Sequence, residues 1–128
     1  MTEHYLLDTD VIIEYLLWSD KAIKVLKNLD GFLYISMLSV AELFSGVKGD
    51  EEEKILEQFL LAFEIIDVDE NLAKAGGTHR RNYHSSHGTA LADAIIAASA
   101  EKIDAILITF NRRHFPMYEK VRVPDQQN

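Results

Sequence analysis

A short apolar run passes directly into a helical pattern in the stretch Tyr5-Leu6-Leu7-Asp8-Thr9-Asp10-Val11-Ile12-Ile13. The run over 5–7 predicts a buried strand that ends at Asp8. From Val11 onwards the apolar residues follow helical spacing, so a helix follows the strand almost at once. A buried strand that turns into a helix is the unit from which parallel α/β sheets are built.

The rest of the chain repeats this alternation. Further strands are predicted over 32–35, 64–68 and 105–108, with an edge strand within 118–123. Helices are predicted over 20–29, 36–46, 50–62, 71–83 and 89–101, with a loop over 85–88. In the helix over 50–62, the apolar side chains Ile55, Leu56, Phe59 and Leu60 are expected to face inward. The fold class is therefore α/β with a mainly parallel central sheet, in one domain over residues 1–128.

The composition narrows the function. The chain has 128 residues, of which 48% are apolar, and no Cys. The absence of Cys excludes disulfide frameworks, thiolate zinc sites, iron–sulfur clusters and a Cys nucleophile. The net charge of −8 argues against a protein that coats nucleic acid through charge alone. It leaves room for nucleic-acid binding through metal ions and local basic patches.

Targeting signals are not evident in the sequence. Glu3 stands where a secretory signal would carry a basic start, and the apolar stretch over 11–18 is interrupted by Glu14 and too short to cross a bilayer. We therefore expect a cytoplasmic protein without a membrane partner.

Polar side chains follow three of the predicted strands, where parallel sheets bind their ligands. They are Asp8, Thr9 and Asp10 after the first strand, Ser36, Ser39 and Glu42 after the second, and Thr109, Asn111 and His114 after the fourth. Each group also has a structural interpretation. Asp8 or Asp10 could cap the first helix, Ser39-x-x-Glu42 matches a capping box, and Thr109 or Asn111 could serve a turn.

Asp93 lies in a helix that is apolar nearly all round, Ala90-Leu91-Ala92-Asp93-Ala94-Ile95-Ile96-Ala97-Ala98. A buried carboxylate is costly without a partner, and no Lys or Arg precedes Lys102 on this helix. One interpretation is a first-turn acid that interacts with the helix dipole. The other is a ligand for a cation outside the chain. Carboxylates without Cys or His suit Mg²⁺ or Mn²⁺, so Asp8, Glu42 and Asp93 are predicted to form a divalent metal site.

Four motifs together resemble the PIN-domain family and, within it, the VapC-like toxin ribonucleases. They are Leu7-Asp8-Thr9-Asp10-Val11-Ile12, Ser36-x-x-Ser39-x-x-Glu42-Leu43, Asp93-Ala94-Ile95-Ile96-Ala97-Ala98 and Thr109-x-Asn111-x-x-His114-Phe115. The resemblance implies a three-layer α/β/α fold and an Mg²⁺-dependent endoribonuclease. It also implies a homodimer that is neutralised by a small cognate antitoxin.

Carried over by position, the resemblance makes Asp8, Glu42 and Asp93 the acidic metal-site residues. Asp8 and Asp93 would bind the principal ion, while Glu42 would hold a water or act as general base. The last motif often has a further acid near Asn111, which is neutral here and would position water or phosphate. Thr9, Asp10 and Thr109 would support the ligands from behind.

Two basic clusters could hold RNA phosphates near an acidic site. Arg112 and Arg113 lie beside the last motif, and Arg80 and Arg81 lie further up the chain. Tyr83, beside the second pair, could stack on a base. The alternative is a solvated basic face that balances the acidic stretch over 50–70.

Other functions fit parts of the pattern. A phosphoacceptor domain would use Asp67 and Lys120, but would leave Glu42 and Asp93 without a purpose. A non-catalytic PIN-fold module that binds RNA or protein is consistent with the neutral Asn111, and a DNA or flap nuclease would need clamps for which the chain is short. The bulky run Tyr15-Leu16-Leu17-Trp18 suits core packing, a dimer interface or an antitoxin groove.

Overall fold

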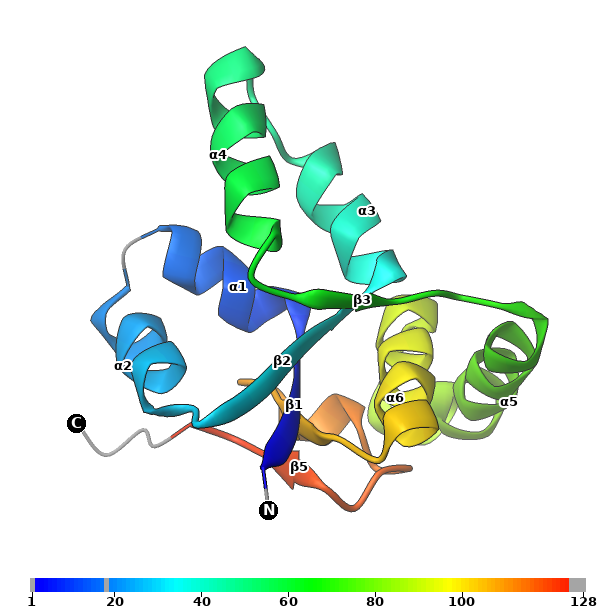
Figure 1. The fold of residues 1–128 in the computed structure, drawn as a ribbon. Coiled ribbons are helices and arrows are strands. Elements are labelled where there is room, and N and C mark those ends of the chain that lie inside the picture. The colour runs from blue at the N-terminus through cyan, green and yellow to red at the C-terminus, as the bar shows by residue number, and fades with distance from the viewer. Residues whose placement is uncertain (1, 18, 125–128) are drawn as a thin grey trace.

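The computed structural model describes residues 2–17 and 19–124, which form a twisted parallel sheet flanked by helices (Figure 1). Five strands pair in the order β3-β2-β1-β4-β5, and every pairing is parallel. The elements in chain order are β1 (Glu3–Leu7), α1 (Thr9–Leu16), α2 (Asp20–Asn28), β2 (Gly31–Ser36), α3 (Met37–Ser45), α4 (Asp50–Leu60), β3 (Glu64–Ile66), α5 (Glu70–His87), α6 (Leu91–Ile103), β4 (Ile106–Ile108), a 3₁₀ turn (Arg112–His114) and β5 (Val121–Arg122). The predicted α/β class with a parallel sheet is confirmed.

Alternating side chains of the central strand divide the core into two layers. Leu6 packs with Ile96 and Leu107 in a cluster shared with α5 and α6. Leu7, on the opposite face, packs with Ile12 in a second cluster that also takes in α3 and α4. Since neighbouring residues of a strand point to opposite faces, one short apolar strand supports both layers. Figure 1 shows α1 and α2 on one side of the sheet and α5 and α6 on the other, which is the three-layer α/β/α arrangement.

The pairing of β1 with β4 continues one residue beyond β1. The backbone N–H of Asp8 donates to the carbonyl of Ile108 at 2.9 Å. This extra bond brings Asp8 alongside Thr109 at the carboxyl edge of the sheet.

Within the described residues, no helix combines the length and apolar character needed to cross a membrane.

The helix α5 corrects one sequence expectation. A loop was predicted over 85–88, but the helix continues to His87 and ends at Gly88, whose φ of 68° is left-handed. Glycine adopts this conformation without a Cβ penalty and closes the helix through its N–H to the carbonyl of His84. Ser85 and Ser86 are therefore helical, and the residue that ends the helix is Gly88.

A second correction concerns α4. Ile55 was predicted to face inward, but its side chain is 56% exposed. The buried stripe of this helix consists of Leu56 and Leu60, one turn apart. Ile55 precedes that stripe and lies at the edge of an apolar groove described below.

Adjacent glycines in α5 give a matched stability test. A Cβ at Gly76 would lie 2.7 Å from Ile95 Cγ1 and 3.2 Å from Ile95 Cα on α6, whereas a Cβ at Gly77 meets nothing within 4 Å. Gly77→Ala should therefore raise the free energy of unfolding by about 0.5–1 kcal/mol through helix propensity. Gly76→Ala should lower it by about 1–2 kcal/mol through overpacking against α6. Urea unfolding of both variants measures the difference, and equal effects would contradict this account of the α5–α6 contact.

Candidate active site

The carboxyl edge of the sheet contains a cavity of about 250 Å³ that is rich in acidic groups. Asp8 lies at the end of β1, Asp10 in the first turn of α1, Glu42 on α3 and Asp93 on α6. The cavity is lined by Asp8, Thr9, Asp10, Ile13, Glu42, Asp93, Ile96, Asn111 and His114. The predicted metal ligands Asp8, Glu42 and Asp93 thus share one cavity, together with Asn111.

Asp8 is the most deeply placed of these acids. Its side chain is buried and accepts two hydrogen bonds, from the Thr9 N–H and from the Thr109 hydroxyl, both at 2.7 Å. It is the N-cap of α1, as the capping interpretation predicts. Burial, followed by the negative charge of Asp10, raises the pKa of Asp8 to about 8. Asp8 is therefore a carboxyl whose ionisation needs a compensating positive charge.

Asp10 faces the same site. Its Oδ2 accepts from the backbone N–H of Phe110 at 3.2 Å, and burial raises the pKa of its carboxyl. Its Oδ1 is buried and has no hydrogen-bond partner among the described residues. A buried carboxylate oxygen without a partner is costly, so this atom is available to a ligand that the chain does not supply.

Glu42 is oriented by hydroxyl groups. The Thr9 hydroxyl donates to Glu42 Oε1 at 2.6 Å and shares a hydrogen bond of 2.7 Å with the buried Ser39 hydroxyl. The capping-box interpretation of Ser39 and Glu42 is wrong, because α3 begins at Met37 and its N-cap is Ser36. Both residues instead lie within the helix, on the side that faces α1. This brace fixes one oxygen of Glu42 and leaves the other free.

Asp93 has partners that the sequence analysis did not assign to it. It lies in the first turn of α6, where its Oδ2 accepts from the Ala90 N–H at 3.2 Å. The same oxygen is 3.3 Å from His114 Nδ1, and Asn111 Nδ2 is 2.9 Å from that nitrogen. His114 is thus a partner of Asp93 from within the chain, and its charge depends on protonation. Asp93 does lie in the first turn of its helix, as the first-turn interpretation predicts. Its side chain is only 19% exposed, so it is not a surface acid.

The loop that follows β4 is held firmly. The Thr109 hydroxyl accepts from the Asn111 N–H at 3.0 Å while it donates to Asp8. The Thr89 hydroxyl, which is buried, donates to the carbonyl of His114 at 2.9 Å. Thr89 and the contact of His114 with Asp93 were missed as site features, and Ser39 was named after the second strand but given only a capping role. Their signal in the sequence was weak, since a hydroxyl near the start of a helix is a common cap and His114 is far from Asp93 in the sequence.

The donor set fits a hard divalent cation. Over residues 2–17 and 19–124, no three Asp, Glu or His side chains already converge into a ready metal cage. The acids are instead held by Thr109, Thr9 and His114 around a common space. All four offer oxygen, which Mg²⁺ and Mn²⁺ prefer. Asp10 Oδ1 has no partner among the described residues, and the pKa of Asp8 is raised. Both observations indicate that the negative charge in this cavity is not balanced by positive charge from the described residues.

The predicted RNA-binding arginines lie outside this cavity. Arg112 uses its guanidinium to donate to the carbonyl of Val121 at 3.1 Å, which joins the loop to β5. Arg113 is exposed beside it, and Arg80 and Arg81 are exposed on α5. Their contact with RNA stays a prediction. Tyr83, proposed to stack on a base, packs edge-on to the His87 ring.

Known proteins match this chain over nearly its whole length. The family model described as the PIN domain matches residues 5–120. The chain is 35% identical over 122 residues to Ribonuclease VapC10 of Mycobacterium tuberculosis, covering 93% of this chain and 91% of that protein. It is 37% identical over 123 residues to Ribonuclease VapC19 of the same organism, covering 93% and 98%. Among solved structures, a chain of a toxin–antitoxin complex from Klebsiella pneumoniae matches with a TM-score of 0.83 at 26% identity, covering 95% and 98%.

The raised pKa of Asp8 predicts how stability depends on pH. An acid with a pKa of about 8 when folded and 3.8 ordinarily binds a proton on folding, so its contribution falls as pH rises through that window. Without divalent metal, Asp8→Asn should therefore raise the melting temperature at about pH 8 by several degrees and change it little at about pH 4. Calorimetric melting of both proteins across this range measures the effect. A difference in melting temperature between Asp8→Asn and the wild type that does not increase with pH would contradict this account of Asp8.

Proposed function

The chain belongs to the PIN domain family, and on that premise we propose that it is an Mg²⁺- or Mn²⁺-dependent endoribonuclease, the toxin of a toxin–antitoxin pair. Membership of this family overturns the phosphoacceptor alternative built on Asp67 and Lys120. Lys120 is instead paired with Asp104 at 2.9 Å. The observation that carries the proposal is the convergence of four carboxylates, from three separate helices and the end of β1, on one cavity. Relatives named as ribonucleases support the substrate class.

Asp8 and Asp93 would hold the principal cation. When bound, that cation would stabilise negative charge on the phosphate and acidify water in the site. Asp10 lines the same cavity, and its Oδ1, which is buried and has no hydrogen-bond partner among the described residues, could join them or orient water. Charge on the cation would offset the mutual repulsion of these acids, which otherwise favours the protonated form of Asp8.

Glu42 would act as the general base. The Thr9 hydroxyl occupies its Oε1, so Oε2 is the atom that takes the proton from the attacking water. Asn111 would donate through its amide to a phosphate oxygen, and protonated His114, whose Nδ1 lies 3.3 Å from Asp93 Oδ2, would hold Asp93 in position. In-line attack of water on phosphorus breaks the bond to the 3′ oxygen. The products would be a 5′-phosphate and a 3′-hydroxyl.

An apolar groove beside the cavity supports an antitoxin partner. It has a volume of about 360 Å³ and lies between α1, α3 and α4, with Leu17 71% exposed and Ile55 56% exposed. Glu42 and Ile13 line both this groove and the acidic cavity. A partner helix with an apolar face, seated here, would lie against the proposed base. We propose that the antitoxin binds this groove and blocks the site, and that the toxin itself is a cytoplasmic homodimer.

Nuclease activity provides the main test. Purified protein should cleave single-stranded RNA with Mg²⁺ or Mn²⁺ and lose cleavage in a chelator. Asp93→Asn should reduce kcat by about 10²-fold or more, because it removes a ligand charge while it keeps the shape of the side chain. Gel assays on end-labelled RNA measure the rate and identify the ends.

The variant also controls for contaminating nuclease. Cleavage that is equal in the wild type and Asp93→Asn, or that persists in a chelator, would reject the mechanism. RNA binding without cleavage by a correctly folded wild type would instead favour the non-catalytic module.

The groove makes a separate prediction for the antitoxin. The product of a short reading frame beside the gene should co-purify with the chain. Leu17→Asp and Ile55→Asp should each weaken that complex by about 100-fold, since they place a charge in an apolar contact. Leu61→Asp is the matched control, because Leu61 is 77% exposed and lies outside the groove. Titration by light scattering or calorimetry measures affinity, and equal effects of all three would exclude the groove as the docking surface.

A further inference from the structure

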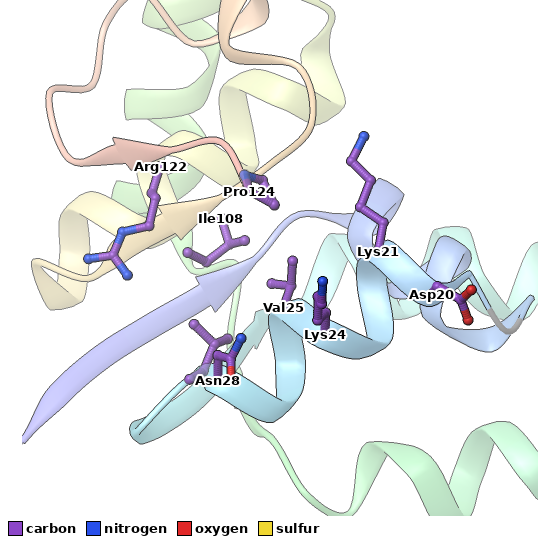
Figure 2. A pocket seen from close by; sticks show the side chains of 9 residues that line it. Asp20, Lys21, Lys24, Val25, Asn28, Ile108, Arg122 and Pro124 are labelled. Atoms are coloured by element: carbon purple, nitrogen blue, oxygen red, sulfur yellow. The ribbon is translucent and has the colours of Figure 1, made fainter. Parts of the chain in front are cut away.

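A second cavity, of about 590 Å³, lies between α2 and the β4–β5 side of the sheet (Figure 2). Its polar lining includes three cations: Lys21 and Lys24 on α2 and Arg122 on β5. Its apolar lining includes Val25 and Ile108. Figure 2 shows the α2 side chains and Arg122 on opposite walls of the same hollow. We call this surface, lined by Lys21, Lys24 and Arg122, the basic groove.

The three cations are not used to stabilise the fold through ion pairs. Within the part of the chain that the structure describes, none of them lies within 4.0 Å of a carboxylate oxygen. Asp20 is the only acid among the described residues that line the groove. Lys21 and Lys24 are three residues apart on a helix, so both project toward the same side. In a chain of net charge −8, three unpaired cations around one hollow mark a surface suited to an anion.

Two residues that follow β4, Thr109 and Phe110, link the basic groove to the acids of the site. The Lys21 ammonium lies 4.7 Å from the centroid of the Phe110 ring, and the Phe110 N–H donates to Asp10 at 3.2 Å. On the other wall, the carbonyl of Arg122 accepts from the Thr109 N–H at 3.2 Å, while the Thr109 hydroxyl bonds Asp8. A single residue therefore separates each wall from an acid of the site: Phe110 lies between Lys21 and Asp10, and Thr109 lies between Arg122 and Asp8. The Arg122 guanidinium rests 5.6 Å from the centroid of the Tyr5 ring, which limits its movement.

We propose that the basic groove binds the backbone of the RNA strand on one side of the phosphate that is cleaved, an inference that rests on the proposed nuclease function. An acidic site repels its polyanionic substrate, so binding energy must come from cations beside the site. Lysine ammonium groups bind phosphates as point charges without sequence preference. The apolar wall offers a surface for ribose and base, as in other single-strand channels. Lys21, Lys24 and Arg122 are therefore substrate-positioning residues, separate from the carboxylates that carry out the chemistry.

Binding of single-stranded RNA to the inactive Asp93→Asn protein tests the groove without cleavage. Adding Lys21→Ala, Lys24→Ala and Arg122→Ala together should raise Kd at least about tenfold and reduce the slope of log K against log salt by roughly two. Lys27→Ala is the control for a charge outside the groove, because it removes one lysine charge from the exposed part of α2; the triple variant removes three, so the effects are compared per charge. Fluorescence anisotropy over a salt series measures both quantities. If the triple variant melts early, Lys24→Glu alone should produce a smaller loss in the same direction, and Lys24→Arg should restore binding.

Kinetics separate this proposal from the proposed function. In the active protein, the triple variant should raise KM for long RNA with little change in kcat, and the effect should disappear with oligonucleotides too short to reach the groove. A triple variant that matches Lys27→Ala in Kd, salt slope and KM overturns the groove while cleavage stands. Loss of affinity for an acidic protein partner, with RNA affinity unchanged, also overturns it. If the wild type does not cleave, a groove-dependent Kd still supports the RNA contact while the nuclease proposal fails.

Discussion

A carboxyl group buried at the end of the central strand is the constraint around which this molecule is organised. Asp8 caps α1 through its hydrogen bond from Thr9, and it joins β1 to the loop after β4 through Thr109. The same side chain lies near Asp10 and Asp93, whose negative charges add to the desolvation that raises its pKa. A hydrophobic residue at this position would remove that repulsion. The arrangement therefore stores an electrostatic cost at the point where a divalent cation would relieve it.

The neighbouring groups suit that arrangement. Thr9 and Ser39 fix one oxygen of Glu42, and Thr89 fixes the turn that carries His114. Hydroxyls are well suited to this work, since they donate to carboxylates without neutralising them. His114 is the exception, because its charge depends on protonation and it faces Asp93 directly. The site thus has two kinds of component: neutral hydroxyls hold the acids in place, and a cation from outside the chain would balance the negative charge of those acids.

The sequence allowed the fold class and the position of the site to be predicted for physical reasons. Short apolar strands alternating with amphipathic helices leave few topologies other than a parallel sheet, and such a sheet directs its strand ends to one edge. The surroundings of individual side chains were harder to predict from the sequence. Ile55 was misplaced because α4 buries a narrower stripe than its apolar residues suggest. Lys21, Lys24 and Arg122 come from two distant segments, so only the folded structure reveals that they line one groove.

The central claim is that Asp8, Glu42 and Asp93, distant in sequence, form one site for a divalent ion, in which Asp8 and Asp93 bind the ion and Glu42 adds its negative charge beside it. Calorimetric titration of the metal-free protein with Mn²⁺ tests it most directly, with the conservative variants Asp8→Asn, Glu42→Gln and Asp93→Asn beside the wild type. We expect saturable binding by the wild type, accompanied by release of a proton from Asp8 near neutral pH, and a loss of affinity in all three variants. Undiminished Mn²⁺ affinity in all three variants, or no binding by the folded wild type, would contradict the account.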